Sequence, residues 1–138
     1  MDKRKFLIAS VTAAMAAAGY SKSAGAQGAP GQRAKLVFML SRKPGTSFAE
    51  FSRYWRENHA PIGSAMPGVR RYIQNHIGGA LDGTALPYDG YTEMWFDDMG
   101  SMLQALQSPE AQAAIDDSEN FLDVEKIQTF VVEEVQVV

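Results

Sequence analysis

Residues 35–61 read KLVFMLSRKPGTSFAEFSRYWRENHAP, and this stretch decides the fold. Residues 35–40 have the length of a strand and carry apolar side chains on both of its faces, which is typical of a strand covered on both sides. Pro44 and Gly45 predict a turn, and Ser47 and Glu50 have the spacing of a helix capping box. Apolar residues then recur at helical spacing, which predicts a helix over residues 47–58 that ends before Pro61.

The remaining sequence extends this strand and helix into a six-element pattern. Residues 69–77 alternate as a second strand, residues 78–90 are rich in glycine and predict a loop, and residues 91–96 predict a third strand. Residues 101–107 and 109–116 predict helix, with a restart at Ser108 and Pro109, and residues 127–137 predict a β-branched last strand. The order β-α-β-β-α-β predicts an α+β, ferredoxin-like domain over residues 35–138, with a four-stranded antiparallel sheet and helices on one face.

The second face of that sheet leads to a prediction about assembly. Val37, Met39, Val132 and Val135 cannot all be covered by two helices on one side of the sheet. An apolar face of this kind needs a partner. We therefore predict a homodimer that packs sheet against sheet.

The N-terminus predicts export. Lys3-Arg4-Lys5 precedes an apolar run of about 13 residues, and Ala24-Gly25-Ala26 follows as a small-residue cleavage site. We expect residues 1–26 to be a signal peptide of the general or twin-arginine type, and residues 27–34 to be a flexible leader. The run is shorter than the roughly 20 residues that span a bilayer, so we expect no permanent membrane anchor and a periplasmic or secreted protein.

Charge and cysteine content exclude several classes of function. Removing residues 1–26 takes away four of the 13 basic residues and one of the 16 acidic residues, which leaves a net charge of −6. An acidic domain of this kind is unsuited to nucleic acid. The chain has no cysteine, which excludes disulfides, zinc knuckles and iron–sulfur centres.

One set of residues resembles a known family. Arg42-x-Pro44-Gly45-x-Ser47 is followed by Phe51-x-x-Tyr54-Trp55-x-x-x-His59-Ala60-Pro61, then by Pro67-Gly68 and Tyr72. This pattern resembles the EthD family, which is named for a protein linked to ethyl tert-butyl ether degradation. The resemblance implies a dimeric α+β barrel. It also implies lyase-like or isomerase-like chemistry on ring-shaped or polyketide-like molecules, generally without a metal or organic cofactor.

Two histidines are the candidates for proton transfer, because an imidazole titrates near neutral pH. His59 occupies the slot that the family pattern marks, and we predict that it is a general base or acid facing a pocket; the alternative is a structural histidine at a helix end. His76 shares a strand face with Tyr72 and Gln74, and these three side chains either line a wall of the pocket or face solvent or a dimer partner.

Five further residues are candidates for substrate binding. Trp55 continues the apolar stripe of the first helix, where a core role competes with a pocket role, and Tyr54 lies at its boundary. Arg42 could hold a carboxylate or enolate oxygen, or form a surface ion pair. Glu93 and Trp95 share one face of the third strand, and alternation alone does not decide whether that face is the inner one.

Three functions remain open from the sequence. The first is a cofactor-independent lyase or isomerase in which histidine moves a proton on a small, largely apolar cyclic or carbonyl compound, with cofactor-free monooxygenation as a variant. The second is a periplasmic binding or accessory protein that holds a hydrophobic small molecule. The third is a purely structural role for the motif.

Overall fold

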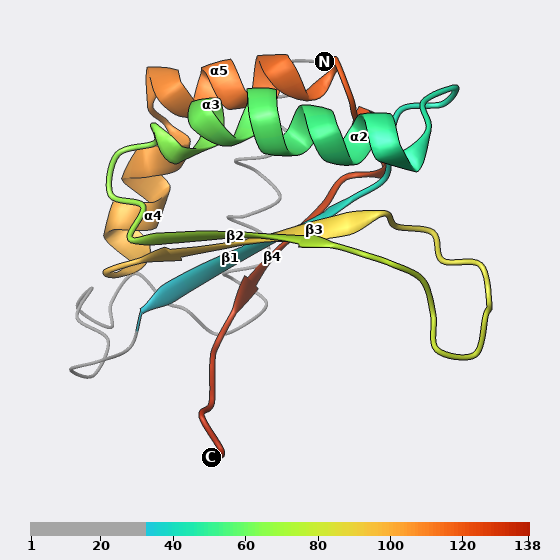
Figure 1. Ribbon diagram of the computed structural model, residues 1–138. Helices are drawn as coiled ribbons and strands as arrows, with labels where there is room; N and C mark the ends of the chain where they lie inside the picture. Colours follow the sequence, from blue (N-terminus) through green and yellow to red (C-terminus); the bar gives the residue numbers. More distant parts are fainter. Residues whose placement is uncertain (1–32) are drawn as a thin grey trace.

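Strand β1 (Ala34–Leu40) lies inside the sheet and pairs with an antiparallel strand on each side. The computed structural model describes residues 33–138; the expected signal peptide and residues 27–32 of the expected leader lie outside them. β2 (Arg71–His76), β3 (Gly90–Phe96) and β4 (Gln128–Val132) complete one antiparallel sheet in the order β2-β3-β1-β4. The predicted ferredoxin-like α+β fold is therefore confirmed (Figure 1).

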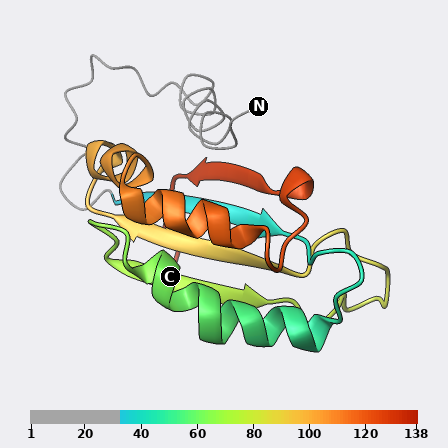
Figure 2. The ribbon, with the colours of Figure 1, turned by 90° about the horizontal axis from the view of Figure 1, so that it is seen from above.

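The helices cover one face of the sheet. α2 (Phe48–Tyr54), α3 (Ala60–Ser64) and α5 (Pro109–Ser118) run across that face, as the view from above shows (Figure 2), and α4 (Met99–Leu106) packs at one end. The predicted capping box is present: the Ser47 side chain accepts from the Glu50 backbone, and the Glu50 side chain accepts from the Ser47 backbone. Ser108 caps α5, with Pro109 in its first turn, as the sequence indicates. No helix in residues 33–138 is long and apolar enough to cross a membrane.

The prediction that Pro61 ends the first helix is wrong. Between α2 and α3 the chain stays helical through a wider π-helical turn, η1 (Trp55–His59), in which the Ala60 N–H donates to the Trp55 carbonyl. A proline ring inside a regular helix clashes with the carbonyl four residues before it and supplies no N–H. A π-helical turn directly before Pro61 widens the backbone where this clash would fall, so α3 can contain the proline.

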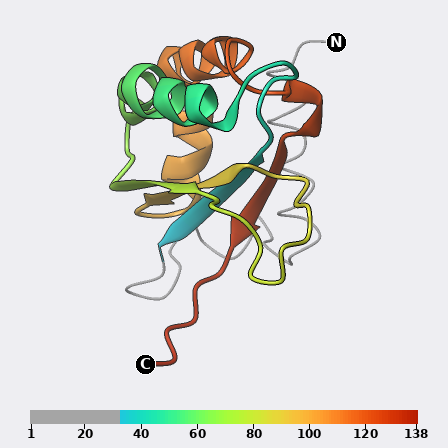
Figure 3. The same ribbon diagram turned by 45° about the vertical axis from the view of Figure 1, so that its right-hand side comes forward.

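The last strand is also shorter than predicted. β4 ends at Val132, which pairs with Lys35, and only Ala34 of β1 precedes that residue. A strand needs a hydrogen-bonding neighbour, so the chain leaves the sheet after Val132 and its end extends away from the domain (Figure 3). The Glu134 side chain still accepts from the Trp95 indole and lies 3.9 Å from Lys35 Nζ. A short 3₁₀ turn, η2 (Val124–Lys126), follows α5 and connects it to β4.

The strand pairing divides the sheet residues between a helix-facing side and an outer face. Tyr72, Gln74 and His76 lie on the helix-facing side, as do Thr92 and Met94. The outer face consists of Lys35, Val37, Met39, Arg71, Ile73, Asn75, Tyr91, Glu93, Trp95, Gln128, Phe130 and Val132.

Two hydrophobic clusters fill the space between the helices and the sheet. One is centred on Leu36, Phe96 and Met102, and the other on Phe51, Trp55 and Phe121. The half-buried ring of Phe38 packs against both clusters. Phe38 therefore connects the two clusters of the core.

Candidate functional site

A cavity of about 80 Å³ lies where the two clusters meet. A single water needs roughly 10–15 Å³ of such space, so the cavity is large enough for a small organic molecule. Four lining residues carry polar side-chain groups: His59, Tyr72, Thr92 and Ser118. The remaining wall consists of Gly63 and the apolar residues Phe38, Leu40, Met66, Met94, Leu106, Ala111, Ala114, Ile115, Leu122 and Ile127.

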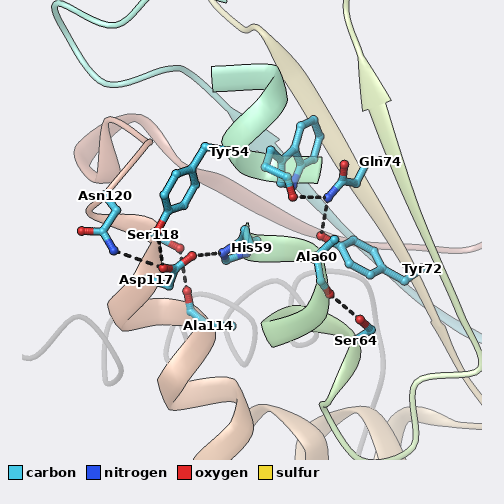
Figure 4. Close-up of polar contacts among 11 residues, drawn as sticks. Tyr54, His59, Ala60, Ser64, Tyr72, Gln74, Ala114, Asp117, Ser118 and Asn120 are labelled. Carbon is cyan, nitrogen blue, oxygen red and sulfur yellow. Dashed lines mark hydrogen bonds and ion pairs between the residues drawn. The ribbon is translucent and has the colours of Figure 1, made fainter. Parts of the chain in front are cut away.

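His59 is held in the cavity wall by Asp117 of α5. Its Nδ1 lies 2.7 Å from Asp117 Oδ2, and the two side chains are only 13% and 11% exposed. The other carboxylate oxygen, Oδ1, accepts from the Tyr54 hydroxyl at 2.7 Å and from Asn120 at 3.1 Å (Figure 4). Three donors therefore hold Asp117, and Asp117 holds the imidazole.

The protonation states follow from these contacts. Burial lowers the pKa of His59 below its ordinary 6.5, although Asp117 acts in the opposite direction. Burial alone would raise the pKa of Asp117, but hydrogen bonds from Tyr54, His59 and Asn120 hold it below its ordinary value. At neutral pH a neutral imidazole thus faces a carboxylate. Since a carboxylate can only accept, Nδ1 carries the hydrogen and Nε2 keeps its lone pair.

Tyr72 also lines the cavity, on β2. Its hydroxyl oxygen accepts from Gln74 Nε2 at 3.2 Å, and Gln74 Nε2 also donates to the Trp55 carbonyl at 2.8 Å (Figure 4). Burial raises the pKa of Tyr72, so the phenol keeps its hydrogen at neutral pH. Gln74 thus does not line the cavity but holds the Tyr72 hydroxyl by a hydrogen bond.

Three of the other predicted residues lie beside the cavity without lining it. His76 bonds to Ser52 Oγ through Nδ1 at 2.8 Å and to Gln74 Oε1 through Nε2 at 3.0 Å. Its ring centroid lies 4.5 Å from that of Trp55, which is fully buried in the core. Tyr54 stacks on Phe121, with 5.1 Å between ring centroids, and reaches the site only through Asp117.

The structure places the last three candidates elsewhere. Arg42 is exposed, and its Nε lies 3.9 Å from an oxygen of Asp89. Glu93 and Trp95 are on the outer face, where Lys35 pairs with Glu93 at 2.6 Å and lies 4.7 Å from the centroid of the Trp95 ring. The strand register, which alternation along one strand does not reveal, puts both residues on the side away from the cavity.

Sequence reasoning missed Asp117. It lies 58 residues after His59, and no short motif joins them. One signal was present: Asp116 and Asp117 stand in the last turn of a helix without a basic residue there. The helix dipole disfavours an acid at this end, so such a residue needs a partner. Within residues 33–138 no cluster of three or more His, Cys, Asp or Glu side chains could hold a metal ion.

Comparison with known proteins agrees with the family resemblance. The EthD domain model matches residues 43–125, which is more than half of the chain. The chain belongs to the EthD family. It is similar to a crystal structure of an EthD family protein from Bacillus halodurans C-125, with 26% identity, a TM-score of 0.64, and coverage of 75% of this chain and 99% of that one.

Two more distant structures share the fold. A mutant of SnoaB from Streptomyces nogalater, described as a cofactor-independent oxygenase, is 12% identical with a TM-score of 0.55, covering 77% of this chain and 96% of that one. A dimeric ferredoxin-like protein of unknown function from Thermobifida fusca YX is 13% identical with a TM-score of 0.57, covering 75% and 92%. No curated protein matches the sequence.

Proposed function

We propose that this EthD protein is a cofactor-independent enzyme in which His59 removes a proton from carbon beside a carbonyl group of a small, largely apolar compound. The observation that carries the proposal is the pairing of His59 with Asp117 in the wall of an otherwise apolar cavity. A positioned imidazole with a free lone pair is suited to general-base catalysis near neutral pH. Asp117 fixes the tautomer and stabilises the imidazolium that forms when Nε2 takes the proton.

The apolar lining defines the substrate class. A small cyclic ketone, lactone or similar compound would gain affinity from burial against Phe38, Met94 and Leu106. Once the carbon proton is on His59, its return to another atom gives isomerisation, and loss of a leaving group gives a lyase reaction. The same carbanion could instead react with O₂: the CH₂ group becomes a carbonyl that keeps one oxygen atom, the other oxygen leaves as water, and the substrate itself supplies the electrons. The fold shared with SnoaB, a cofactor-independent oxygenase, supports this monooxygenase variant.

A binding protein is the second candidate. The lining is almost entirely apolar, which suits retention of a hydrophobic molecule without chemistry. The two candidates differ in what they require of His59, because only the enzyme uses its lone pair.

Hydrogen exchange separates them. Cyclic ketones, lactones and hydroxyquinones would be incubated with the protein in D₂O, and deuterium at the carbon next to the carbonyl would be followed by NMR. The His59→Asn variant is expected to lose about 10²- to 10⁴-fold of the catalysed exchange, and Arg42→Ala, on the surface away from the cavity, should retain it. Ligand binding without exchange in the wild type, or exchange unchanged by His59→Asn, would favour the binding protein.

We also propose that the protein is exported and dimeric. The leader sequence supports export to the periplasm or beyond, and the mass of exported protein tests it, because cleavage after Ala26 removes residues 1–26. Phe130, 40% exposed on the outer face, and the dimeric relative from Thermobifida fusca support a homodimer that packs through this face.

A further inference from the structure

The hydroxyl of Tyr72 lies in the cavity wall, and the residues around it fix the direction of its hydrogen bonds. Its oxygen accepts from Gln74, and its hydrogen has no acceptor among residues 33–138. A buried hydroxyl that lacks an acceptor is unfavourable in an apolar space. The question is which way the O–H points, and the neighbouring side chains determine the answer.

The direction is set first at Gln74. The Trp55 carbonyl can only accept, so the part of the Gln74 amide that faces it at 2.8 Å is the NH₂ group. The amide oxygen then faces His76 Nε2 at 3.0 Å, and Nε2 must carry a hydrogen. His76 Nδ1 therefore accepts from Ser52 at 2.8 Å, and Ser52 Oγ accepts from Arg56 at 3.2 Å.

These hydrogen bonds form a series in which each donor points the same way, from Arg56 toward Tyr72. The series begins at an exposed guanidinium and passes through Ser52, His76 and Gln74 to the oxygen of Tyr72. The indole N–H of Trp55 also approaches this oxygen, without ordinary hydrogen-bond geometry, and has no other partner. With donors on its protein side, the Tyr72 oxygen is occupied as an acceptor and its own hydrogen is left for the cavity.

We propose that Tyr72 donates a hydrogen bond to a carbonyl or enolate oxygen of the substrate, and that Gln74 and His76 are positioning residues that fix this direction. The inference rests on the proposed function and adds the second half of its site. As the C–H bond breaks, the proton goes to His59 Nε2 and the electron pair moves onto the carbonyl oxygen. The Tyr72 hydrogen bond then stabilises the negative charge where it develops.

The binding test uses two probes of nearly equal shape. Cyclohexanone has an acceptor oxygen, and methylenecyclohexane has a CH₂ group in its place. Tyr72→Phe is expected to weaken cyclohexanone binding about three- to tenfold, the usual effect of one hydrogen bond, and to leave methylenecyclohexane binding unchanged. In infrared spectra, the carbonyl stretch of bound cyclohexanone should lie at lower frequency in the wild type than in Tyr72→Phe. Equal effects on both probes, together with an unshifted carbonyl stretch, would overturn the proposal.

The direction of the chain has its own test. In Gln74→Glu an oxygen replaces the NH₂ group. When this carboxyl group is ionised it can accept the Tyr72 hydrogen but cannot donate to the Trp55 carbonyl, which would turn the hydroxyl away from the cavity. This variant should lose the preference for cyclohexanone although the phenol remains. If a folded Gln74→Glu protein, verified by its thermal transition and by the infrared band of an ionised carboxylate, keeps the wild-type preference, Gln74 does not set the direction. If the variant does not fold, the Tyr72→Phe comparison still decides the role of Tyr72.

Failure of the two proposals is distinguishable. His59→Asn should lose about 10²- to 10⁴-fold of the exchange without changing the ratio of the two probe affinities, and Tyr72→Phe should change the ratio. A wild type that catalyses no exchange but loses its ketone preference in Tyr72→Phe would refute the base and retain the donor. The reverse result would refute the donor and retain the base.

Discussion

The proposed base, His59, is active only while its Nε2 is unprotonated, and this gives the first prediction at the scale of the residue. Burial lowers the pKa of His59 below 6.5, so the active form persists at mildly acidic pH. We expect the rate of proton exchange to fall at acidic pH with a midpoint below pH 6.5. A pH–rate profile measures this, and a midpoint above 6.5 would contradict the buried, neutral imidazole.

Asp117 gives a second prediction at the same scale. Asp117 raises the pKa of His59 against the effect of burial, so Asp117→Asn should move the acid limb of the pH–rate profile to still lower pH. An asparagine can also turn its NH₂ group toward Nδ1, which would place the hydrogen on Nε2 and remove the base. We therefore expect a loss of rate of about 10²-fold or more. An unchanged limb in Asp117→Asn would mean that Asp117 does not act on His59.

The same burial affects stability. The unfolded chain protonates His59 near pH 6.5 while the folded chain resists protonation, so His59 makes the free energy of unfolding decrease as the pH falls through 6.5 toward the lower folded pKa. Urea unfolding at several pH values should show a smaller decrease in His59→Gln than in the wild type. His76, whose pKa burial also lowers, contributes in the same direction and remains in both proteins.

Sequence reasoning at the level of single residues named His59 and Tyr72 as candidates, together with Tyr54, Gln74 and His76 that support them, but it missed Asp117. Helical spacing and the family pattern point to His59 within one element. Asp117 comes from another helix, and only the packing of α5 against η1 brings the two together. Glu93 was left undecided for a related reason, because the pairing of β3 with β1 fixes which face is inner.

At the scale of the element, two glycines at close contacts should respond differently to alanine. A Cβ on Gly90 would lie 2.7 Å from both the Asn75 carbonyl and the Trp55 ring, whereas one on Gly63 would lie 3.4 Å from Tyr72. We expect Gly90→Ala to lower the free energy of unfolding by about 1–3 kcal/mol through overpacking. Gly63→Ala, within α3, should leave it unchanged or raise it by up to about 1 kcal/mol.

Urea unfolding measures both changes, and the same variants report on the site. A methyl group added at Gly63 would lie 3.6 Å from the Tyr72 hydroxyl and fill cavity space beside it. Gly63→Ala should therefore weaken cyclohexanone binding without loss of stability. Equal stability of the two alanine variants would show that Gly90 is not required for the packing of Trp55.

The elements themselves were predictable, but their junctions were less so. Capping residues and apolar spacing placed β1, α4, α5 and the start of α2 to within two residues. The π-helical turn was missed because proline ordinarily ends a helix, and only the widened backbone before Pro61 shows why it does not here. The end of β4 was missed because strand length depends on its neighbour, and β1 has only Ala34 left beyond the Lys35 pairing.

At the scale of the whole molecule, the proposed homodimer depends on the outer face of the sheet. We expect the mature chain to be a dimer at micromolar concentration, and Phe130→Glu to shift it toward monomer by placing a charge on this face. Sedimentation or light scattering measures the change. Glu110→Lys, an exposed position on α5, is the matched control that should stay dimeric. A wild-type monomer would remove the argument for sheet-to-sheet packing.

The proposed base and the proposed donor are held by different residues: Asp117 of α5 binds His59, whereas Gln74 of β2 binds Tyr72. The residues that hydrogen-bond around His59 and those that hydrogen-bond around Tyr72 are two separate sets. Mutations on β2 could therefore alter which oxygen-bearing compounds are accepted while the proton chemistry survives. Directed evolution of substrate choice in this scaffold would best begin on that strand.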